Sequence, residues 1–462
     1  MSWTNAEGLA HREAINRGLS ARSPHSAAKA SKVGDEQAKC PIYNGRPPTN
    51  CAFDVRLFHP AFENFSRRYH GTEELQKVDM ASVHTFLVSF AEHYESEHEL
   101  WRRITPYLNA LLGRDFADIE DPDGIHPDGA VVYTSGQTLF AAPLLLIELE
   151  SEIGGGDADA TMQAGLSYRR FWAHNQVFIC FSLIDLCSPI HQKESRASCC
   201  PAFLLAIMGP WICVLGAVFT DKPIVQPLTP LLWLGRMKSQ YEQVTRVFAA
   251  LSMGIDELQD SYSKVDFSRV SSARFFPYIT SFKTNTGQDI QFSYERYAEP
   301  YGQISKPVFV GRTEDDQKII VKFTEAYNDE AQILLAEEGF ATPLLHCNRE
   351  TFQDFTMVIM GYVDGKQLFQ KYSDKVLGEV SKALAILHSK DLVFGDLRSP
   401  NILVTNEDKV QLVDFDWCGK KGEGTYPVDI NLVDIQWPEG VVPGGYLQVE
   451  HDEEMYQMLS LQ

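Results

Sequence analysis

Two short runs near the C-terminal end of the chain carry side chains suited to phosphoryl transfer. They are VFGDLRSPNILV at residues 393–404 and VQLVDFDWCG at residues 410–419. Asp396 and Asn401 lie five residues apart on a predicted loop, with Arg398 between them, and Asp414 follows a short apolar strand. Phosphoryl transfer needs a carboxylate near the attacking hydroxyl, and an amide oxygen with a second carboxylate to hold magnesium against ATP. These four residues are therefore predicted to be catalytic, with Asn401 and Asp414 as Mg2+ ligands.

The same runs resemble the catalytic and metal-binding loops of the protein kinase-like superfamily, whose patterns are HRDxxxxN and DFG. The resemblance covers roughly residues 275–462. It implies a compact bilobal fold in which Lys322, on the predicted strand IIVKF, contacts the phosphates of ATP. It also implies that Glu330, at the start of the next helix, is the ion-pair partner of Lys322, and that Met360 belongs to the hinge of the nucleotide site.

Several features depart from the kinase pattern. Phe394-Gly395 stands where His-Arg is usual, and Asp416 replaces the glycine of DFG. The sequence of these loops is therefore more similar to that of aminoglycoside and choline kinase relatives. No GxGxxG pattern precedes Lys322, which predicts an unconventional phosphate-covering loop. The 48 residues after Asp414 indicate a shortened C-terminal lobe. The acceptor is therefore left open between a protein and a small-molecule hydroxyl.

A second acidic group lies in the first half of the chain. Asp128 precedes one predicted strand, and Glu148 and Glu150 end the next one, LLLIELE. Side chains alternate along a strand, so Glu148 and Glu150 share one face and Leu149 takes the other. Because carboxylates are preferred ligands of Mg2+, Asp128, Glu148 and Glu150 are predicted to approach closely enough to share one ion.

This spacing resembles the PD-(D/E)XK nuclease superfamily, whose acidic residues bind the catalytic metal. Gln163 and Tyr168, five positions apart on the next predicted helix, look like the QxxxY-type element of some relatives, with one more residue between them. Glu150 occupies the usual lysine position, so a degenerate nuclease-like domain with a local nucleic acid contact is expected. A nuclease-like domain followed by a kinase-like domain resembles Crinkler-type effector and toxin proteins, and AVFTDKPIVQPLTPLLW at 217–233 is similar to fungal kinase-like proteins.

Periodicity and composition predict a multidomain protein of the α+β or α/β class. Residues 1–50 hold 7 basic and 4 acidic residues with little apolar periodicity, which predicts a flexible basic tail. A helical segment and the nuclease-like α/β domain are expected over residues 51–255, and a polar linker over 256–272. The kinase-like domain is expected over residues 273–462. The uncharged stretch 201–220 is long enough to span a bilayer, but its central Gly-Pro favours a buried helix followed by a strand, so no membrane contact is expected.

Composition excludes several classes of protein. The 462 residues carry 62 acidic against 41 basic side chains, a net charge of -21, which argues against a general binder of nucleic acid backbones. The nine cysteines show no CxxC spacing, so neither a disulfide framework nor a zinc site is predicted. With no secretory signal in the first residues, an intracellular location, cytoplasmic or nuclear, is expected.

Three classes of function are compatible with these patterns. The preferred one is an ATP- and Mg2+-dependent phosphotransferase that acts on a protein or small-molecule hydroxyl. The second is a metal-dependent nuclease or toxin effector with a regulatory kinase-like domain. The third is a nucleotide-binding pseudokinase that acts as an interaction protein. The sequence makes no prediction of oligomeric state.

Overall fold

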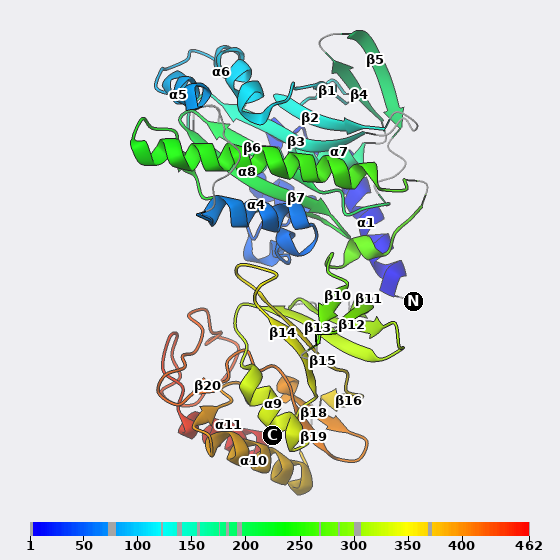
Figure 1. The fold of residues 1–462 in the computed structure, drawn as a ribbon, viewed down its shortest axis with the longest axis vertical. Coiled ribbons are helices and arrows are strands. Elements are labelled where there is room, and N and C mark those ends of the chain that lie inside the picture. Colours follow the sequence, from blue (N-terminus) through cyan, green and yellow to red (C-terminus); the bar gives the residue numbers. More distant parts are fainter. Residues whose placement is uncertain are drawn as a thin grey trace. The chain divides into compact units, whose positions relative to one another are not determined.

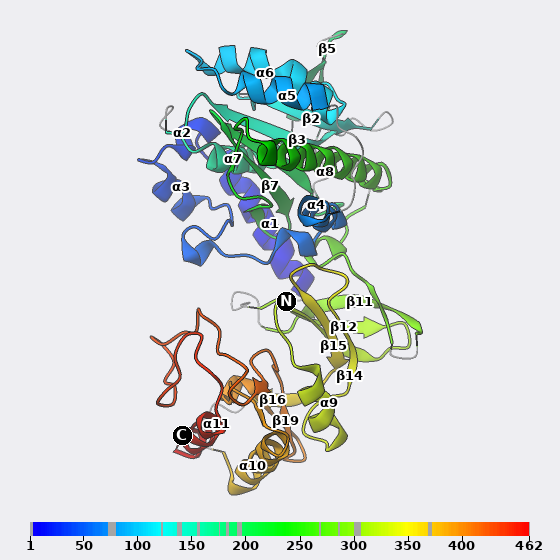
Figure 2. The same ribbon diagram turned by 60° about the vertical axis from the view of Figure 1, so that its left-hand side comes forward.

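The computed structural model forms two compact units, Met1–Ile279 and Thr280–Gln462 (Figure 1, Figure 2). It describes residues 3–461 except 73–79, 122, 136–140, 155–157, 175, 182–183, 192–195, 268, 285–286, 300–305 and 368–371. A mixed α/β composition is confirmed for both units. Within the described ranges, no helix has the length and apolar character needed to cross a bilayer.

A mixed sheet forms the core of the first unit, with strand order β2-β3-β6-β7-β8 and β9 paired to β7. The strands are β2 (Gly129–Thr134), β3 (Ala141–Glu150), β6 (Ala202–Met208), β7 (Trp211–Phe219), β8 (Pro223–Pro227) and β9 (Leu232–Trp233). β3 and β6 are parallel, and the other neighbours are antiparallel. Every residue of β3 is buried, which accounts for its nearly unbroken apolar run.

Helices pack against this sheet. α7 (Ala160–Ala173) and α8 (Lys238–Ser263) both contact β3 and β6, and α8 crosses the sheet in the view of Figure 1. The predicted helical segment is confirmed as α4 (Pro60–His70), α5 (Met80–Ser89) and α6 (Glu97–Leu112). A small sheet, β1-β4-β5, and three short 3-10 helices complete the unit: β1 (Asp118–Glu120), β4 (Gln176–Phe181), β5 (Ile184–His191), η1 (Pro48–Asn50), η2 (Val55–Leu57) and η3 (Ala273–Phe275).

The predicted flexible tail over residues 1–50 is wrong for the described part of that range. Its helices are α1 (Trp3–Leu19), α2 (Pro24–Ala28) and α3 (Val33–Lys39), and both α1 and α2 pack against α7. Glu36 and Arg169 form a buried ion pair of 2.8 Å that joins α3 to α7. Ala27 and Ala28 are buried in a small apolar cluster. These helices are ordered by tertiary contacts, which weak local periodicity does not reveal.

The predicted helix before Gly209 is also wrong. Residues 201–220 contain two antiparallel strands, β6 and β7, with Gly209 at φ 51 and Pro210 in the turn between them. The periodicity of a short apolar run does not distinguish a helix from a buried strand. Here β6 is a strand because it pairs with β3 on one side and with β7 on the other.

The second unit starts at Thr280, after the predicted linker 256–272, and the first part of that stretch belongs to α8, which extends to Ser263. A six-stranded antiparallel sheet is its first element of structure. Its order is β10-β11-β12-β13-β15-β14. The strands are β10 (Ser281–Lys283), β11 (Asp289–Tyr297), β12 (Val308–Thr313), β13 (Lys318–Thr324), β14 (Leu344–Asn348) and β15 (Thr356–Gly361). α9 (Asp329–Glu337) follows β13, and the side chain of Asn328 caps it by accepting from Ala331 N.

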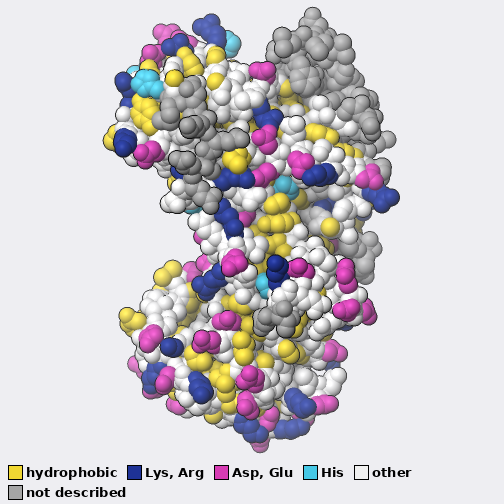
Figure 3. Space-filling view, in the orientation of Figure 1, with side chains coloured by type: hydrophobic (Ala, Val, Ile, Leu, Met, Phe, Trp, Pro, Cys, Tyr) yellow, Lys and Arg dark blue, Asp and Glu magenta, His cyan; other side chains and the backbone are white. Residues whose placement is uncertain are grey.

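The other described elements of the second unit are helices and short strands joined by loops. They are β16 (Gly365–Gln367), α10 (Asp374–His388), β17 (Leu392–Val393), η4 (Ser399–Asn401), β18 (Ile402–Thr405), β19 (Val410–Leu412), β20 (Gly419–Lys420) and α11 (Val449–Leu461). One apolar core includes residues of α9, β15, α10 and α11. Figure 3 shows acidic, basic and apolar side chains interspersed over the visible face of this unit.

Candidate functional site

The structure brings Asp396, Arg398 and Asn401 together on the loop between β17 and β18. Asp396 and Asn401 are buried, with exposed fractions of 3% and 6%. Asn401 donates from Nδ2 to the Asp396 carboxylate over 2.8 Å and to its backbone oxygen over 2.9 Å. Arg398 donates to both oxygens of the same carboxylate, from Nη2 over 2.7 Å and from Nε. The Asp396 carboxylate is therefore held in one orientation by two neighbours of its own loop.

Asp414 lies beside this loop, just after β19. The backbone N–H of Val413 donates to the carbonyl of Asn401 over 3.0 Å and so joins the two segments. The Asp414 carboxylate pairs with Lys306 at 2.5 Å and with Lys322. Burial alone would raise the pKa of Asp414, but these two ammonium groups hold it well below its ordinary value. Asp414 is therefore an anion at neutral pH.

Lys322 lies on β13, and only 4% of the residue is exposed. Besides Asp414 it pairs with Asp416, whose Oδ1 is 2.6 Å from the lysine Nζ. The predicted pair with Glu330 is not formed. Asn328 caps α9, so Glu330 falls in the exposed first turn of the helix and forms no ion pair with another described residue. Met360, predicted to belong to the nucleotide site, lies on β15 and is buried in the apolar core.

Lys306 and Asp416 belong to this cluster, although the sequence prediction omits them as site residues. Lys306 is brought there by the sheet, because Pro307 accepts from the backbone N–H of Phe323 over 3.0 Å and Val308 pairs with Lys322. Burial first, and then the charge of Asp414, raise the pKa of Asp416 to about 6. The second acid of DFDW was the available signal for Asp416, whereas nothing near Lys306 in sequence marks it.

Asp452 is a further residue that sequence reasoning missed. It lies on α11, is fully buried, and its carboxylate accepts from Phe394 N over 2.7 Å and from Gly395 N over 2.9 Å. His388 Nε2, at the end of α10, is 3.0 Å from the same carboxylate. Asp452 therefore links two helices to the backbone immediately before Asp396.

Replacing Asp452 with alanine is expected to destabilise the second unit by about 2–6 kcal/mol, because two buried backbone N–H groups lose their acceptor at roughly 1–3 kcal/mol each. Urea unfolding of the full chain would measure this. Glu453→Ala, an exposed neighbour on the same helix, is the control and is expected to leave stability nearly unchanged. Equal stability of the two variants would contradict this role of Asp452.

In the first unit, β3 presents Glu148 and Glu150, both buried. Gln163 Nε2 and Ser167 Oγ, on α7, each donate to the Glu148 carboxylate over 2.5 Å. Burial, and then the charge of Asp128, raise the pKa of Glu148 well above its ordinary value. Gln163 thus contacts the carboxylate of Glu148 directly.

Two predicted members of this region behave differently from Gln163. Tyr168 donates its hydroxyl to the carbonyl of Cys200 over 2.7 Å, away from Glu148. Asp128 accepts from Leu149 N over 2.8 Å. Across the described ranges, the group of metal-ligand atoms that all lie within 4.8 Å of one another is not the predicted trio but Asp121, Asp123 and His174.

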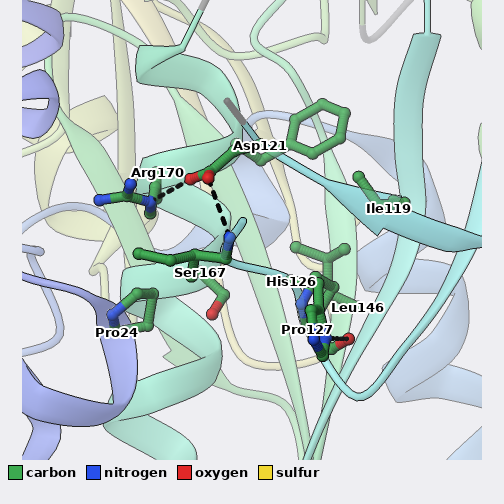
Figure 4. A pocket seen from close by; sticks show the side chains of 10 residues that line it. Pro24, Ile119, Asp121, His126, Pro127, Leu146, Ser167 and Arg170 are labelled. Atoms are coloured by element: carbon green, nitrogen blue, oxygen red, sulfur yellow. Dashed lines mark hydrogen bonds and ion pairs between the residues drawn. The ribbon is translucent and has the colours of Figure 1, made fainter. Parts of the chain in front are cut away.

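The negative charge of Asp121 and Asp123 is compensated by the guanidinium of Arg170. Arg170 donates to Asp121 and, over 2.6 Å, to Asp123. Figure 4 shows Arg170 and Asp121 facing one another beside Ser167, where they line a small cavity of about 30 Å³. Because Arg170 supplies positive charge to both carboxylates, the arrangement acts as a partly buried ion pair.

The pKa of Glu150 leads to a pH-dependent prediction. Burial first, and then the adjacent Glu97, raise this pKa from 4.5 to about 8. A carboxyl whose pKa is higher in the folded state binds its proton more tightly there, so its contribution to stability is lost as pH rises from 4.5 through about 8. Glu150→Gln should weaken this dependence and be more stable than wild type at pH 8.

Urea unfolding of the full chain at pH 5 and pH 8 tests this prediction for Glu150. The control is Glu152→Gln, since the Glu152 side chain is 50% exposed and its removal should leave the pH dependence as in wild type. A Glu150→Gln variant whose stability falls with pH as steeply as that of wild type would contradict the assignment.

The comparisons with known proteins reach part of the chain. No protein-family model matches it. A bifunctional tRNA threonylcarbamoyladenosine biosynthesis protein of Methanospirillum hungatei is 26% identical over 228 residues, which are 49% of this chain and 37% of the relative. The cAMP-dependent protein kinase type 3 of Saccharomyces cerevisiae is 31% identical over 135 residues, 27% of this chain and 32% of the relative.

A cAMP-dependent protein kinase catalytic subunit of Arthrobotrys oligospora is 28% identical over 142 residues, 28% of this chain and 27% of the relative. The chain thus spans roughly a third of the length of each relative. None of the three is described as a nuclease. Part of this chain is similar to cAMP-dependent protein kinases.

Proposed function

We propose that the second unit transfers the γ-phosphoryl group of ATP to a hydroxyl group in a Mg2+-dependent reaction. The observation that supports this proposal is the convergence of Asp396, Asn401 and Asp414 with Lys322, from a loop, a strand end and a central strand. The partial similarity to cAMP-dependent protein kinases agrees with it. Because each relative is matched over a minor part of its length, the acceptor is proposed only as a protein or small-molecule hydroxyl.

The donor set fits a magnesium ion. A carboxylate and an amide oxygen are hard ligands of the kind Mg2+ takes, and the low pKa of Asp414 keeps that ligand charged. Asp414 and Asn401 would hold the ion, whose positive charge offsets that of the phosphates. Lys306 and Lys322, which now pair with Asp414, are placed to contact the phosphates once the ion occupies that carboxylate.

Asp396 would contact the acceptor. Its carboxylate would accept a hydrogen bond from the attacking hydroxyl and direct that oxygen toward the γ-phosphorus. Asn401 fixes the carboxylate from one side, and Arg398 contributes positive charge where negative charge develops on the transferred group. Contacts with both Arg398 and Asn401 hold the Asp396 carboxylate in one orientation.

The proposed activity is tested with purified full-length protein. Calorimetry should detect ATP binding that requires Mg2+, and ATP labelled at the γ-position should transfer label to a protein or small-molecule acceptor. Binding without transfer to any acceptor would favour the pseudokinase class. Absence of Mg2+-dependent ATP binding would reject the proposal.

A metal-dependent nuclease in the first unit is a second candidate, as in the nuclease-like and Crinkler-type resemblance. The observation that favours it is the Glu148 carboxylate, oriented by Gln163 and Ser167 and adjacent to Glu150 on the same strand. Mg2+- or Mn2+-dependent cleavage of DNA or RNA that is lost in Glu148→Gln and kept in Lys322→Met would support it. Equal cleavage by wild type and Glu148→Gln would exclude it.

A further inference from the structure

The partner of Lys322 is the feature of the second unit that departs most from the expected nucleotide site. A buried ammonium needs a carboxylate close by, because an unpaired charge in the interior is costly. Lys322 has two such partners, Asp414 and Asp416. In the proposed reaction Asp414 also binds magnesium, so Asp416 is the one of these two carboxylates that is not a proposed metal ligand.

The helix that follows β13 does not supply the missing partner. Glu330 is exposed in the first turn of α9. The ring of Tyr327 lies 5.5 Å from Lys322 Nζ, and its hydroxyl donates to Gln332 Oε1 over 2.6 Å. Gln332 is fully buried and donates in turn to the carbonyl of Thr342. Tyr327, which lies against the lysine, and its hydrogen-bond partner Gln332 are therefore uncharged side chains.

Asp416 is held beside Lys322 by the backbone around it. Asn328, the capping residue of α9, donates from its backbone N–H to the carbonyl of Phe415 over 3.2 Å and from Nδ2 to the carbonyl of Cys418 over 3.1 Å. These two bonds flank Asp416. The side chain of Phe415, the residue before Asp416, is buried in the core of the unit. The Asp416 side chain itself is 13% exposed and is 2.6 Å from Lys322 Nζ.

We propose that Asp416, and not Glu330, is the carboxylate that positions Lys322 toward the phosphates of ATP. Asp416 acts through Lys322 and is thus a positioning residue. Asp416, which stands in place of the glycine of the DFG pattern, then supplies the negative charge beside Lys322 that α9 does not supply. This inference rests on the proposed ATP-dependent function, and it gives Asp416 the pairing role that the kinase-like resemblance implies for Glu330.

Matched neutral variants test the proposal. Asp416→Asn is expected to weaken ATP binding in the presence of Mg2+ by about 10-fold or more, because the buried Lys322 ammonium loses the charged partner that is not a proposed metal ligand. Glu330→Gln, the control, should change ATP affinity by less than about 2-fold, as an exposed carboxylate contributes little. Asp416→Glu should recover part of the affinity. In turnover, the defect of Asp416→Asn should appear mainly in KM for ATP, with a smaller change in kcat.

A structure of the wild-type protein with Mg2+ and a non-hydrolysable ATP analogue provides a test that does not depend on how the variants fold. The expected result is a Lys322–Asp416 ion pair with Glu330 still exposed. A shift of α9 that pairs Glu330 with Lys322, or a Glu330→Gln variant that loses more ATP affinity than Asp416→Asn, would overturn the inference while leaving the proposed function intact. Absence of ATP binding by wild type would instead reject the proposed function, and the inference with it.

Discussion

Asp396→Asn is expected to lower phosphoryl transfer by about 100-fold or more, while ATP affinity stays within about 2-fold of wild type. The asparagine keeps the shape of the side chain and one oxygen for the loop hydrogen bonds, but it removes the charge that attracts the acceptor hydroxyl proton. It also removes the bidentate contact with Arg398. ATP affinity should be spared, because Asp414 and Asn401, the proposed metal ligands, are unchanged.

Single-turnover transfer from labelled ATP and calorimetry with Mg2+-ATP measure the two effects separately. Asp408→Asn is a suitable control, since this aspartate is in the same unit, its side chain is 60% exposed, and it pairs with an exposed lysine. It should transfer at the wild-type rate. Undiminished transfer by Asp396→Asn would remove Asp396 from the reaction while leaving the kinase-like arrangement in place.

Lys322→Met is expected to abolish measurable ATP binding and to destabilise the protein without nucleotide by about 3–5 kcal/mol at pH 8. The methionine fills similar space but leaves Asp414 and Asp416 with Lys306 as their remaining cation. The pKa of Asp416 is already raised to about 6, so this carboxyl takes up a proton below that pH. The destabilisation should therefore be smaller at pH 5 than at pH 8.

Urea unfolding at the two pH values, with and without Mg2+-ATP, checks these expectations for Lys322. Lys375→Met is the matched control, because the Lys375 side chain is 63% exposed and its pair with Asp408 lies at the surface. Its effect should be less than about 1 kcal/mol. If Lys322→Met retained the stability of wild type at pH 8, the ion pairs of Lys322 with Asp414 and Asp416 would not stabilise the folded protein.

Much of the secondary structure follows from local patterns. The apolar composition and the length of the runs at Gly129–Thr134, Ala141–Glu150 and Lys318–Thr324 identify strands. The helices Ala160–Ala173 and Asp329–Glu337 follow Asp159 and Asn328, whose residue types favour capping positions. These elements are predictable because their signals act between residues close in sequence.

The predictions of secondary structure and of unit boundaries are wrong where contacts between residues distant in sequence determine the structure. Ala202–Met208 is apolar enough for a helix or a strand, and pairing with β3 makes it a strand. The first residues lack periodicity, yet Glu36 on α3 pairs with Arg169 on α7. The boundary between units lies after Ile279 and not in the polar stretch 256–272, because much of that stretch continues α8.

The sequence by itself determined which residues of the second unit come together in the proposed site. Asp396, Arg398 and Asn401 sit within one loop, so their spacing alone implies that they can meet, and the structure places them in hydrogen-bond contact. Asp414 is recognisable because it ends an apolar strand at a short distance along the chain. In each case the distance in sequence is small enough for local geometry to bring the groups together.

Only the tertiary structure decided which charges pair with Lys322 and what holds the loop that carries Asp396. Lys306 reaches Asp414 across 108 positions of sequence, and Asp452 accepts from Phe394 across 58. An ion pair depends on distance in space and on burial, and neither is encoded in the spacing of two distant residues. The sequence pattern therefore pointed to Glu330, whereas the cap of α9 exposes that residue and the packing around Asn328 places Asp416 beside the lysine.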